Sequence, residues 1–165
     1  MKQILFDVDG VFLSEERCFD VSALTVYEML YSDQFLNLQS TIDLTHLSEN
    51  DIRKIRKDVF LDDKILNQLK SLGLNSNWDM LFIVISTHLI DLLKKANTSK
   101  FDLSNQNFSI ETLKGWSKEL SNYNIELETP LEFLSQATSG KENIYSDLIE
   151  FAKSQLNIED ASIFE

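Results

Sequence analysis

The chain has 165 residues, 43% of them apolar, so it is long enough and apolar enough to bury one substantial core. Its 27 acidic and 15 basic side chains give a formal charge of −12, which disfavours binding to nucleic-acid phosphates or to anionic membranes. The single cysteine, Cys18, cannot form an intramolecular disulfide, and the short apolar run before Asp7 is too brief for a signal peptide or a membrane span.

We therefore expect a cytoplasmic protein that binds neither nucleic acid nor a membrane. A phosphate ester can still bind to an acidic protein if a divalent cation neutralises the pocket locally. The composition indicates no oligomeric state.

The N-terminal segment carries the acids of greatest chemical interest. An apolar run at residues 3–6 ends at Asp7-Val8-Asp9-Gly10, which is typical of a buried strand that delivers acids to its C-terminal edge. Asp7 and Asp9 would share one face of such a strand, while Gly10 would let the chain leave steeply. One carboxylate can attack phosphorus to form an aspartyl-phosphate, and the other can act as general acid and base. Alternatively, the two acids only end a strand and cap a turn.

After this segment the pattern becomes helical. Apolar residues recur mostly at three- and four-residue intervals over residues 21–31, which predicts an amphipathic helix. Residues 48–51 resemble a capping box and predict a helix that begins there. Asp62-Asp63 predicts the start of another helix, which Gly73 would end as a C-terminal cap. The charged residues between 49 and 70 are expected on solvated helix faces and in ion pairs.

The most apolar part of the chain, residues 80–93, allows two interpretations. In the first, residues 76–79 cap one long buried helix that runs to about Lys95. In the second, residues 81–85 form a buried strand that ends at Ser86-Thr87, and a helix begins near His88. The explicit cap and the lack of a turn signal favour the helix.

The C-terminal third also has a helical pattern. Residues 97–109 are polar and predict a loop, and residues 110–120 predict a helix that Gly115 weakens by roughly 1 kcal/mol. Thr129-Pro130 predicts a further helix start, and residues 142–156 carry a helical apolar stripe. Residues 161–164 are expected to form a short strand or the beginning of another element.

The N-terminal residues Ile4-Leu5-Phe6-Asp7-Val8-Asp9-Gly10-Val11 closely resemble the first motif of the haloacid-dehalogenase-like (HAD) hydrolases. The resemblance implies an α/β, Rossmann-like core with a short N-terminal strand and a mainly helical cap. It implies that Asp7 is the nucleophile and a Mg²⁺ ligand. Asp9 would be the general acid and base, and would bind Mg²⁺ through its backbone carbonyl. Oxygen ligands without a His/Cys cluster favour Mg²⁺ over zinc.

The implied enzyme is a phosphatase of a small phosphorylated metabolite, with dehalogenase or mutase chemistry as alternatives within the family. Residues 1–20 would be the first strand and catalytic loop, and residues 21–165 a mainly helical, cap-like region that leaves the α/β core incomplete. A different hypothesis is a non-catalytic helical binding or interaction module that keeps the acid pair.

Later residues offer candidates for the remaining parts of such a site. Ser86 or Thr87 can imitate the hydroxyl of the second motif, and Lys141 the basic residue of the third. The acids nearest the C-terminus, at residues 159–160, precede the possible strand rather than follow it. His46 and His88 are isolated in sequence, so each is interpreted as a surface or packed residue rather than a metal ligand.

Overall fold

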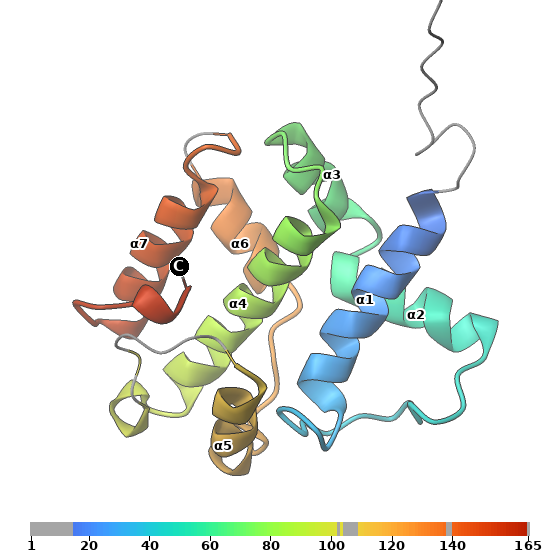
Figure 1. The fold of residues 1–165 in the computed structure, drawn as a ribbon, viewed down its shortest axis with the longest axis horizontal. Coiled ribbons are helices and arrows are strands. Elements are labelled where there is room, and N and C mark those ends of the chain that lie inside the picture. Colours follow the sequence, from blue (N-terminus) through green and yellow to red (C-terminus); the bar gives the residue numbers. More distant parts are fainter. Residues whose placement is uncertain (1–14, 102, 104–108, 138–139, 165) are drawn as a thin grey trace, which may run out of the picture.

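The computed structural model describes residues 15–101, 103, 109–137 and 140–164, and all regular structure in these ranges is helical (Figure 1). The α-helices, in chain order, are α1 (Glu15–Tyr31), α2 (Glu49–Phe60), α3 (Lys64–Ser71), α4 (Asn77–Lys95), α5 (Ile110–Leu120), α6 (Thr129–Gln136) and α7 (Ile144–Leu156). Two short 3₁₀ helices, η1 (Thr98–Lys100) and η2 (Ser162–Phe164), complete the described elements.

The predicted α/β fold class is wrong, because the described residues form an all-α fold without a strand. That prediction depended on the apolar run at residues 3–6, which lies outside the described residues. The alternative strand at residues 81–85 is also wrong, since this segment lies in the middle of α4. Residues 161–164 do not form a strand either, but contribute to η2. An all-α structure does not fit the Rossmann-like core that the HAD resemblance implies.

Helix α4 forms the centre of the molecule. It packs against α1 on one side and against α6 and α7 on the other (Figure 1). Every residue from 83 to 93 is buried, including four polar ones. A helix that is buried on all sides needs neighbours on all sides, which explains why its sequence is apolar without a single clear stripe. No described helix is both long and apolar enough to cross a membrane.

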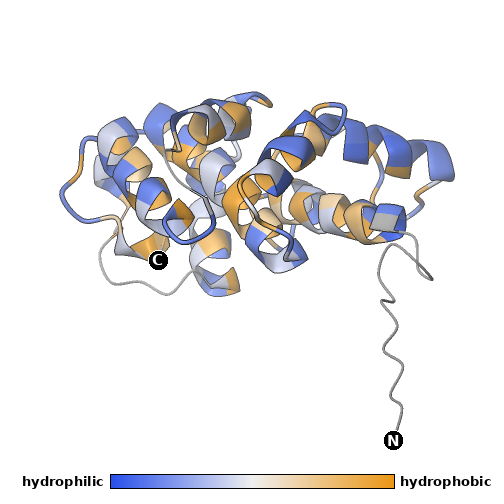
Figure 2. Ribbon diagram, turned by 90° about the horizontal axis from the view of Figure 1, so that it is seen from above, coloured by the Kyte–Doolittle hydropathy of each residue, from blue (hydrophilic) through white to orange (hydrophobic). Residues whose placement is uncertain are grey.

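Helices α1, α6 and α7 pack directly against α4, whereas α2 and α3 pack mainly against other helices. Helix α2 packs against α1, and α3 packs against α6. Figure 2 shows hydrophobic residues mainly where helices meet and hydrophilic residues mainly on outward faces. Burying one Leu, Ile or Phe side chain contributes about 1.5–3 kcal/mol, so these contacts supply the main stabilising term of the fold.

Three predicted caps are confirmed. The Ser76 hydroxyl accepts from the backbone N–H of Asp79 at 3.4 Å at the start of α4. The Ser48 hydroxyl accepts from the backbone N–H of Asp51 at 3.2 Å, and the Asp51 carboxylate accepts from the backbone N–H of Ser48 at 2.9 Å. Gly73 has φ +80°, and the N–H of Leu74 donates to the carbonyl of Leu69 at 3.1 Å, which closes α3 in a Schellman arrangement. These caps fix the start of α2 and the turn between α3 and α4.

A buried carboxylate joins α4 to the segment before α6. Asp91 is 9% exposed, and its Oδ2 accepts from the backbone N–H of Glu126 at 2.9 Å and from Lys95 Nζ at 2.9 Å. Lys95 also donates to the carbonyl of Asn124 at 2.7 Å. The connection between α5 and α6 is thereby attached to the central helix.

Candidate functional site

The predicted catalytic and metal-binding residues, Asp7 and Asp9, lie outside the described residues. Residues 10–14 join them to Glu15, the first residue of α1. In the part of the chain that is described, no group of three or more His, Cys, Asp and Glu side chains is arranged to hold a metal ion.

Ser86 and Thr87 lie inside α4, where the favoured interpretation placed them. Both are fully buried, and the Thr87 hydroxyl donates to the carbonyl groups of Ile83 at 3.0 Å and Val84 at 2.9 Å. Such back-bonding to the preceding turn is common for threonine within helices. Ser86 Oγ has no hydrogen-bond partner among the described residues. Neither hydroxyl follows a strand, as the second HAD motif would require.

Lys141 is exposed and lies in the connection between α6 and α7. Its backbone N–H donates to the carbonyl of Leu72 at 2.9 Å, which attaches this connection to the end of α3. The structure therefore gives Lys141 a position at the surface, away from the buried Ser86 and Thr87.

The two histidines have the positions that their isolation in sequence suggested. The His46 side chain is 87% exposed, with Nδ1 at 2.8 Å from the Thr45 hydroxyl oxygen and 3.7 Å from the Asp43 carboxylate. His88 is fully buried within α4. Neither of its ring nitrogens has a hydrogen-bond partner among the residues described.

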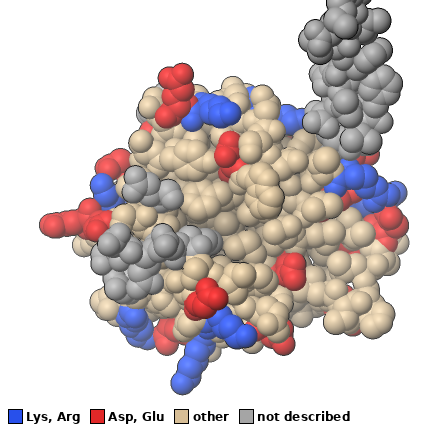
Figure 3. Space-filling view, in the orientation of Figure 1, with Lys and Arg blue, Asp and Glu red and all other residues tan. Residues whose placement is uncertain are grey.

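A cleft of ≈310 Å³ lies beside the start of α1, and we call it the charged cleft. In Figure 3, basic and acidic side chains lie side by side at the right edge of the molecule, near this end of α1. The lining residues of the charged cleft come from α1, α2 and the turn after α2: Glu16, Arg17, Asp20, Glu49, Arg53, Arg56, Lys57, Asp62 and Asp63.

Arg56 is the centre of an ion-pair network in the charged cleft. Its Nη1 lies 3.4 Å from Asp20 Oδ1, and its Nε lies 3.3 Å from Asp63 Oδ1. Only 20% of the Arg56 side chain is exposed, so water screens these pairs less than it would on the open surface. Arg17 adds ion pairs with Asp20 at 3.5 Å and Glu49 at 3.3 Å. The network holds α1, α2 and the following turn together.

A helix begins where Asp62-Asp63 predicted one, because Asp63 is the N-cap residue of α3. Both residues have left-handed backbone conformations, with φ of 53° and 64°. Asp63 occupies the N-cap position of α3 without a side-chain capping bond. Its carboxylate instead binds Arg56, so the ion pair with α2 replaces the expected cap.

Arg53 is the basic residue of the cleft that is available to a ligand. No ion pair or side-chain hydrogen bond joins it to another described residue, whereas Arg17, Arg56 and Lys57 each have an acidic partner. A guanidinium group binds phosphate oxygens in a bidentate manner. The sequence predicted solvated faces and ion pairs for these charges, and it did not indicate a ligand site among them. The three- and four-residue spacing of Arg53, Arg56 and Lys57 is the signal that places them on one face of α2.

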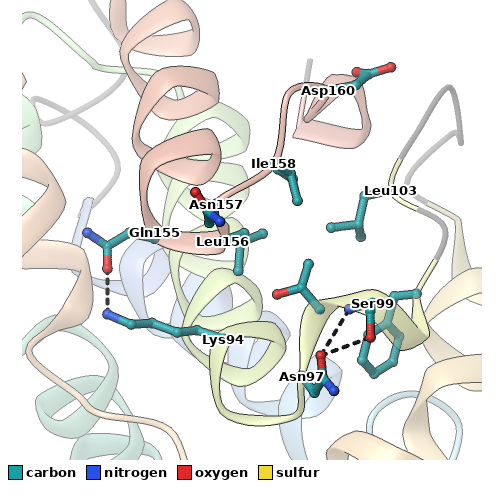
Figure 4. A pocket seen from close by; sticks show the side chains of 11 residues that line it. Lys94, Asn97, Ser99, Leu103, Gln155, Leu156, Asn157, Ile158 and Asp160 are labelled. Atoms are coloured by element: carbon teal, nitrogen blue, oxygen red, sulfur yellow. Dashed lines mark hydrogen bonds between the residues drawn. The ribbon is translucent and has the colours of Figure 1, made fainter.

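A larger groove, of ≈580 Å³, lies between the end of α4 and the end of α7 (Figure 4). Lys94 Nζ donates to Gln155 Oε1 at 2.7 Å across one side of it. On the other side, Asn97 Oδ1 accepts from the backbone N–H of Ser99 at 3.3 Å and from its hydroxyl at 2.9 Å. These polar groups bind one another.

Comparison with models of known protein families finds no match, and comparison with curated proteins finds none either. The chain is similar over its whole length to a solved X-ray structure, Northeast Structural Genomics Consortium target ZR25, with 54% sequence identity and a TM-score of 0.87. The chain spans 44% of the length of that protein's chain. This similarity names no family or activity. The predicted HAD membership is contradicted by the all-helical fold, and the chain is a helical region similar to part of a longer solved protein.

Proposed function

We propose that the protein is a magnesium-dependent hydrolase of a small phosphorylated molecule, in which Asp7 and Asp9 carry the chemistry and the charged cleft binds the substrate. The observation that supports this most directly is the sequence Asp7-Val8-Asp9-Gly10 a few residues before the helix end that forms the cleft. The chain from Asp9 to Glu15 can extend by at most about 20 Å, which is the upper limit on the distance between Asp9 and the start of α1.

The two acids have complementary roles in the proposed reaction. An Asp7 carboxylate oxygen attacks phosphorus, and the bond between phosphorus and the leaving oxygen breaks while Asp9 gives that oxygen a proton. Water then attacks the aspartyl-phosphate, Asp9 accepts the proton of the water, and inorganic phosphate leaves with Asp7 regenerated. Two carboxylates suit Mg²⁺, a hard cation that prefers oxygen ligands. Bound Mg²⁺ would supply positive charge that reduces the repulsion between the acids and the phosphate.

The residues of the charged cleft support a substrate that carries other polar groups besides its phosphate. Arg53 offers donors to phosphate oxygens, and the surrounding carboxylates offer acceptors to hydroxyl or amino groups. Positioning of this kind accelerates the reaction because it holds the phosphoryl group in line with the attacking oxygen.

The nucleophile assignment is tested in the full-length native protein with Mg²⁺ and p-nitrophenyl phosphate. Asp7→Asn should abolish turnover and the acyl-phosphate that can be trapped from the parent, because the amide is not a nucleophile. Asp9→Asn should slow hydrolysis by about 10²–10⁴-fold, and less for esters with good leaving groups. Turnover by Asp7→Asn at the parental rate would refute the proposal. Magnesium binding without turnover in the parent would favour the non-catalytic binding module.

The role of the cleft is tested separately with Arg53→Gln, using a small sugar phosphate as the substrate. Loss of one charge-assisted hydrogen bond corresponds to about 1.5–3 kcal/mol, so we expect KM to rise by roughly 10–100-fold. Lys114→Gln is the matched control, because Lys114 is an exposed cation on α5 and does not line the cleft. Equal KM values for the two variants would remove the charged cleft from the substrate site.

A further inference from the structure

A second cavity lies against the central helix, at the other end of α1 from the charged cleft, and we call it the central cavity. Its volume is ≈300 Å³, at the small end of the range for small-molecule sites. Five segments form its walls: the end of α1, residues 38–42, α2, α4 and residues 124–127. Its lining residues are Tyr27, Leu30, Tyr31, Leu38, Gln39, Ser40, Thr41, Ile42, Lys54, Asp58, Val59, His88, Asn124, Ile125 and Leu127.

His88 gives this cavity an unusual inner wall. The residue is 0% exposed, and neither Nδ1 nor Nε2 has a hydrogen-bond partner among the described residues. Buried polar groups are nearly always hydrogen-bonded, so each such nitrogen indicates a group that a partner can satisfy. Burial lowers the pKa of His88 to about 3, so its ring is neutral and presents one donor and one acceptor.

The remaining walls combine two tyrosines and six aliphatic side chains with four neutral polar residues and one charge of each sign. The rings of Tyr27 and Tyr31 lie against each other with centroids 4.3 Å apart. The Tyr27 hydroxyl is 2.6 Å from Ser40 Oγ, which accepts from the backbone N–H of Ile42 at 3.0 Å. Lys54 and Asp58 contribute one positive and one negative charge to the lining. These walls favour a flat, uncharged ring over an ion.

We propose that the central cavity binds a small, neutral heteroaromatic molecule whose ring N–H or ring nitrogen forms a hydrogen bond with His88. The ring packs beside the tyrosines, where aromatic contacts add about 0.5–1.5 kcal/mol beyond area burial. Since His88 is 0% exposed, contact requires a small outward shift of the cavity wall. Residues 39–41 are exposed and lie between helices, so they are the part of the wall that can move at the lowest cost.

The experiment is an NMR titration of the ¹⁵N-labelled protein at pH 7.5 with three bicyclic probes: benzimidazole, indole and indene. Benzimidazole has a ring N–H and a ring nitrogen, indole has only the N–H, and indene has neither. We expect saturable shifts at residues 39–42 and 124–127, with affinity falling in that order. His88→Leu should weaken benzimidazole binding about tenfold and leave indene binding unchanged.

Two further variants keep the test decisive. His46→Gln, a change at an exposed histidine, should leave all three affinities unchanged. Ile125→Trp should fill the cavity and reduce binding of every probe, since Ile125 lines it and is only partly buried. Equal affinity of His88→Leu and the parent for benzimidazole, shifts outside the cavity, or shifts that do not saturate would overturn the proposal. The readout needs no turnover, so it is independent of the proposed hydrolase activity.

Discussion

Replacing His88 by leucine should stabilise the protein. Both ring nitrogens are buried without a hydrogen-bond partner among the described residues. A buried polar group left unsatisfied costs about 1–3 kcal/mol, and leucine has a similar volume without polar atoms. We therefore expect the free energy of unfolding of His88→Leu to exceed that of the parent by about 1–3 kcal/mol at pH 8, where histidine is neutral in both states.

The difference should grow as the solution becomes more acidic. The pKa of His88 falls from 6.5 to about 3 on folding, mainly because burial disfavours the charged ring. Below pH 6.5 the unfolded chain therefore binds a proton that the folded chain does not, and the parent loses stability as pH falls towards 3. One pH unit corresponds to about 1.4 kcal/mol, so the advantage of His88→Leu should be about 2 kcal/mol larger at pH 5 than at pH 8.

The measurement is urea unfolding followed by circular dichroism at several pH values between 5 and 8. The carboxylates titrate in both proteins, so their contribution cancels in the difference between the two curves. His46→Gln is the control, because it removes a histidine whose side chain is 87% exposed rather than buried. A difference between His88→Leu and the parent that stays constant from pH 8 to pH 5 would show that His88 is not a neutral buried group.

Two further changes test the local interactions that build the fold. Ser48→Ala removes the hydroxyl of the capping box, so we expect a loss of about 1 kcal/mol in the free energy of unfolding, measured in urea; an unchanged midpoint would contradict the cap. Asp91→Ala removes the acceptor of the Glu126 N–H and of Lys95 Nζ, so we expect a loss of about 1.5–3 kcal/mol and faster amide exchange at Glu126. Unaltered exchange at Glu126 would show that this bond does not hold the connection.

The helices were predictable because their signals are local. Residues 48–51 and Gly73 determine two helix ends through bonds between residues close in sequence. Thr129-Pro130 located the start of α6 to within one residue, since α6 begins at Thr129 and its cap position is Glu128. The α/β prediction was wrong because it inferred a whole fold from one short N-terminal segment that resembles a HAD motif.

The candidate sites were much less predictable, because contacts between distant segments create them. Arg56 binds Asp20, a residue of another helix, and periodicity within α2 does not reveal that partner. His88 was predicted to be either a surface or a packed residue, and the structure shows that it is packed. Its missing hydrogen bonds depend on the side chains that surround α4. Ion pairs and missing hydrogen bonds between distant segments depend on the folded arrangement, and no pattern in a single sequence reveals them.

The central position of α4 limits how the molecule can move. Because α1 packs on one side of α4 and α6 and α7 pack on the other, both groups of helices are joined through the same central helix. A hinge between them would expose residues 83–93, most of which are apolar, and close-packed cores resist continuous deformation. We therefore expect a bound molecule to displace the connections between helices, such as residues 39–41. The helices around α4 should move as one body.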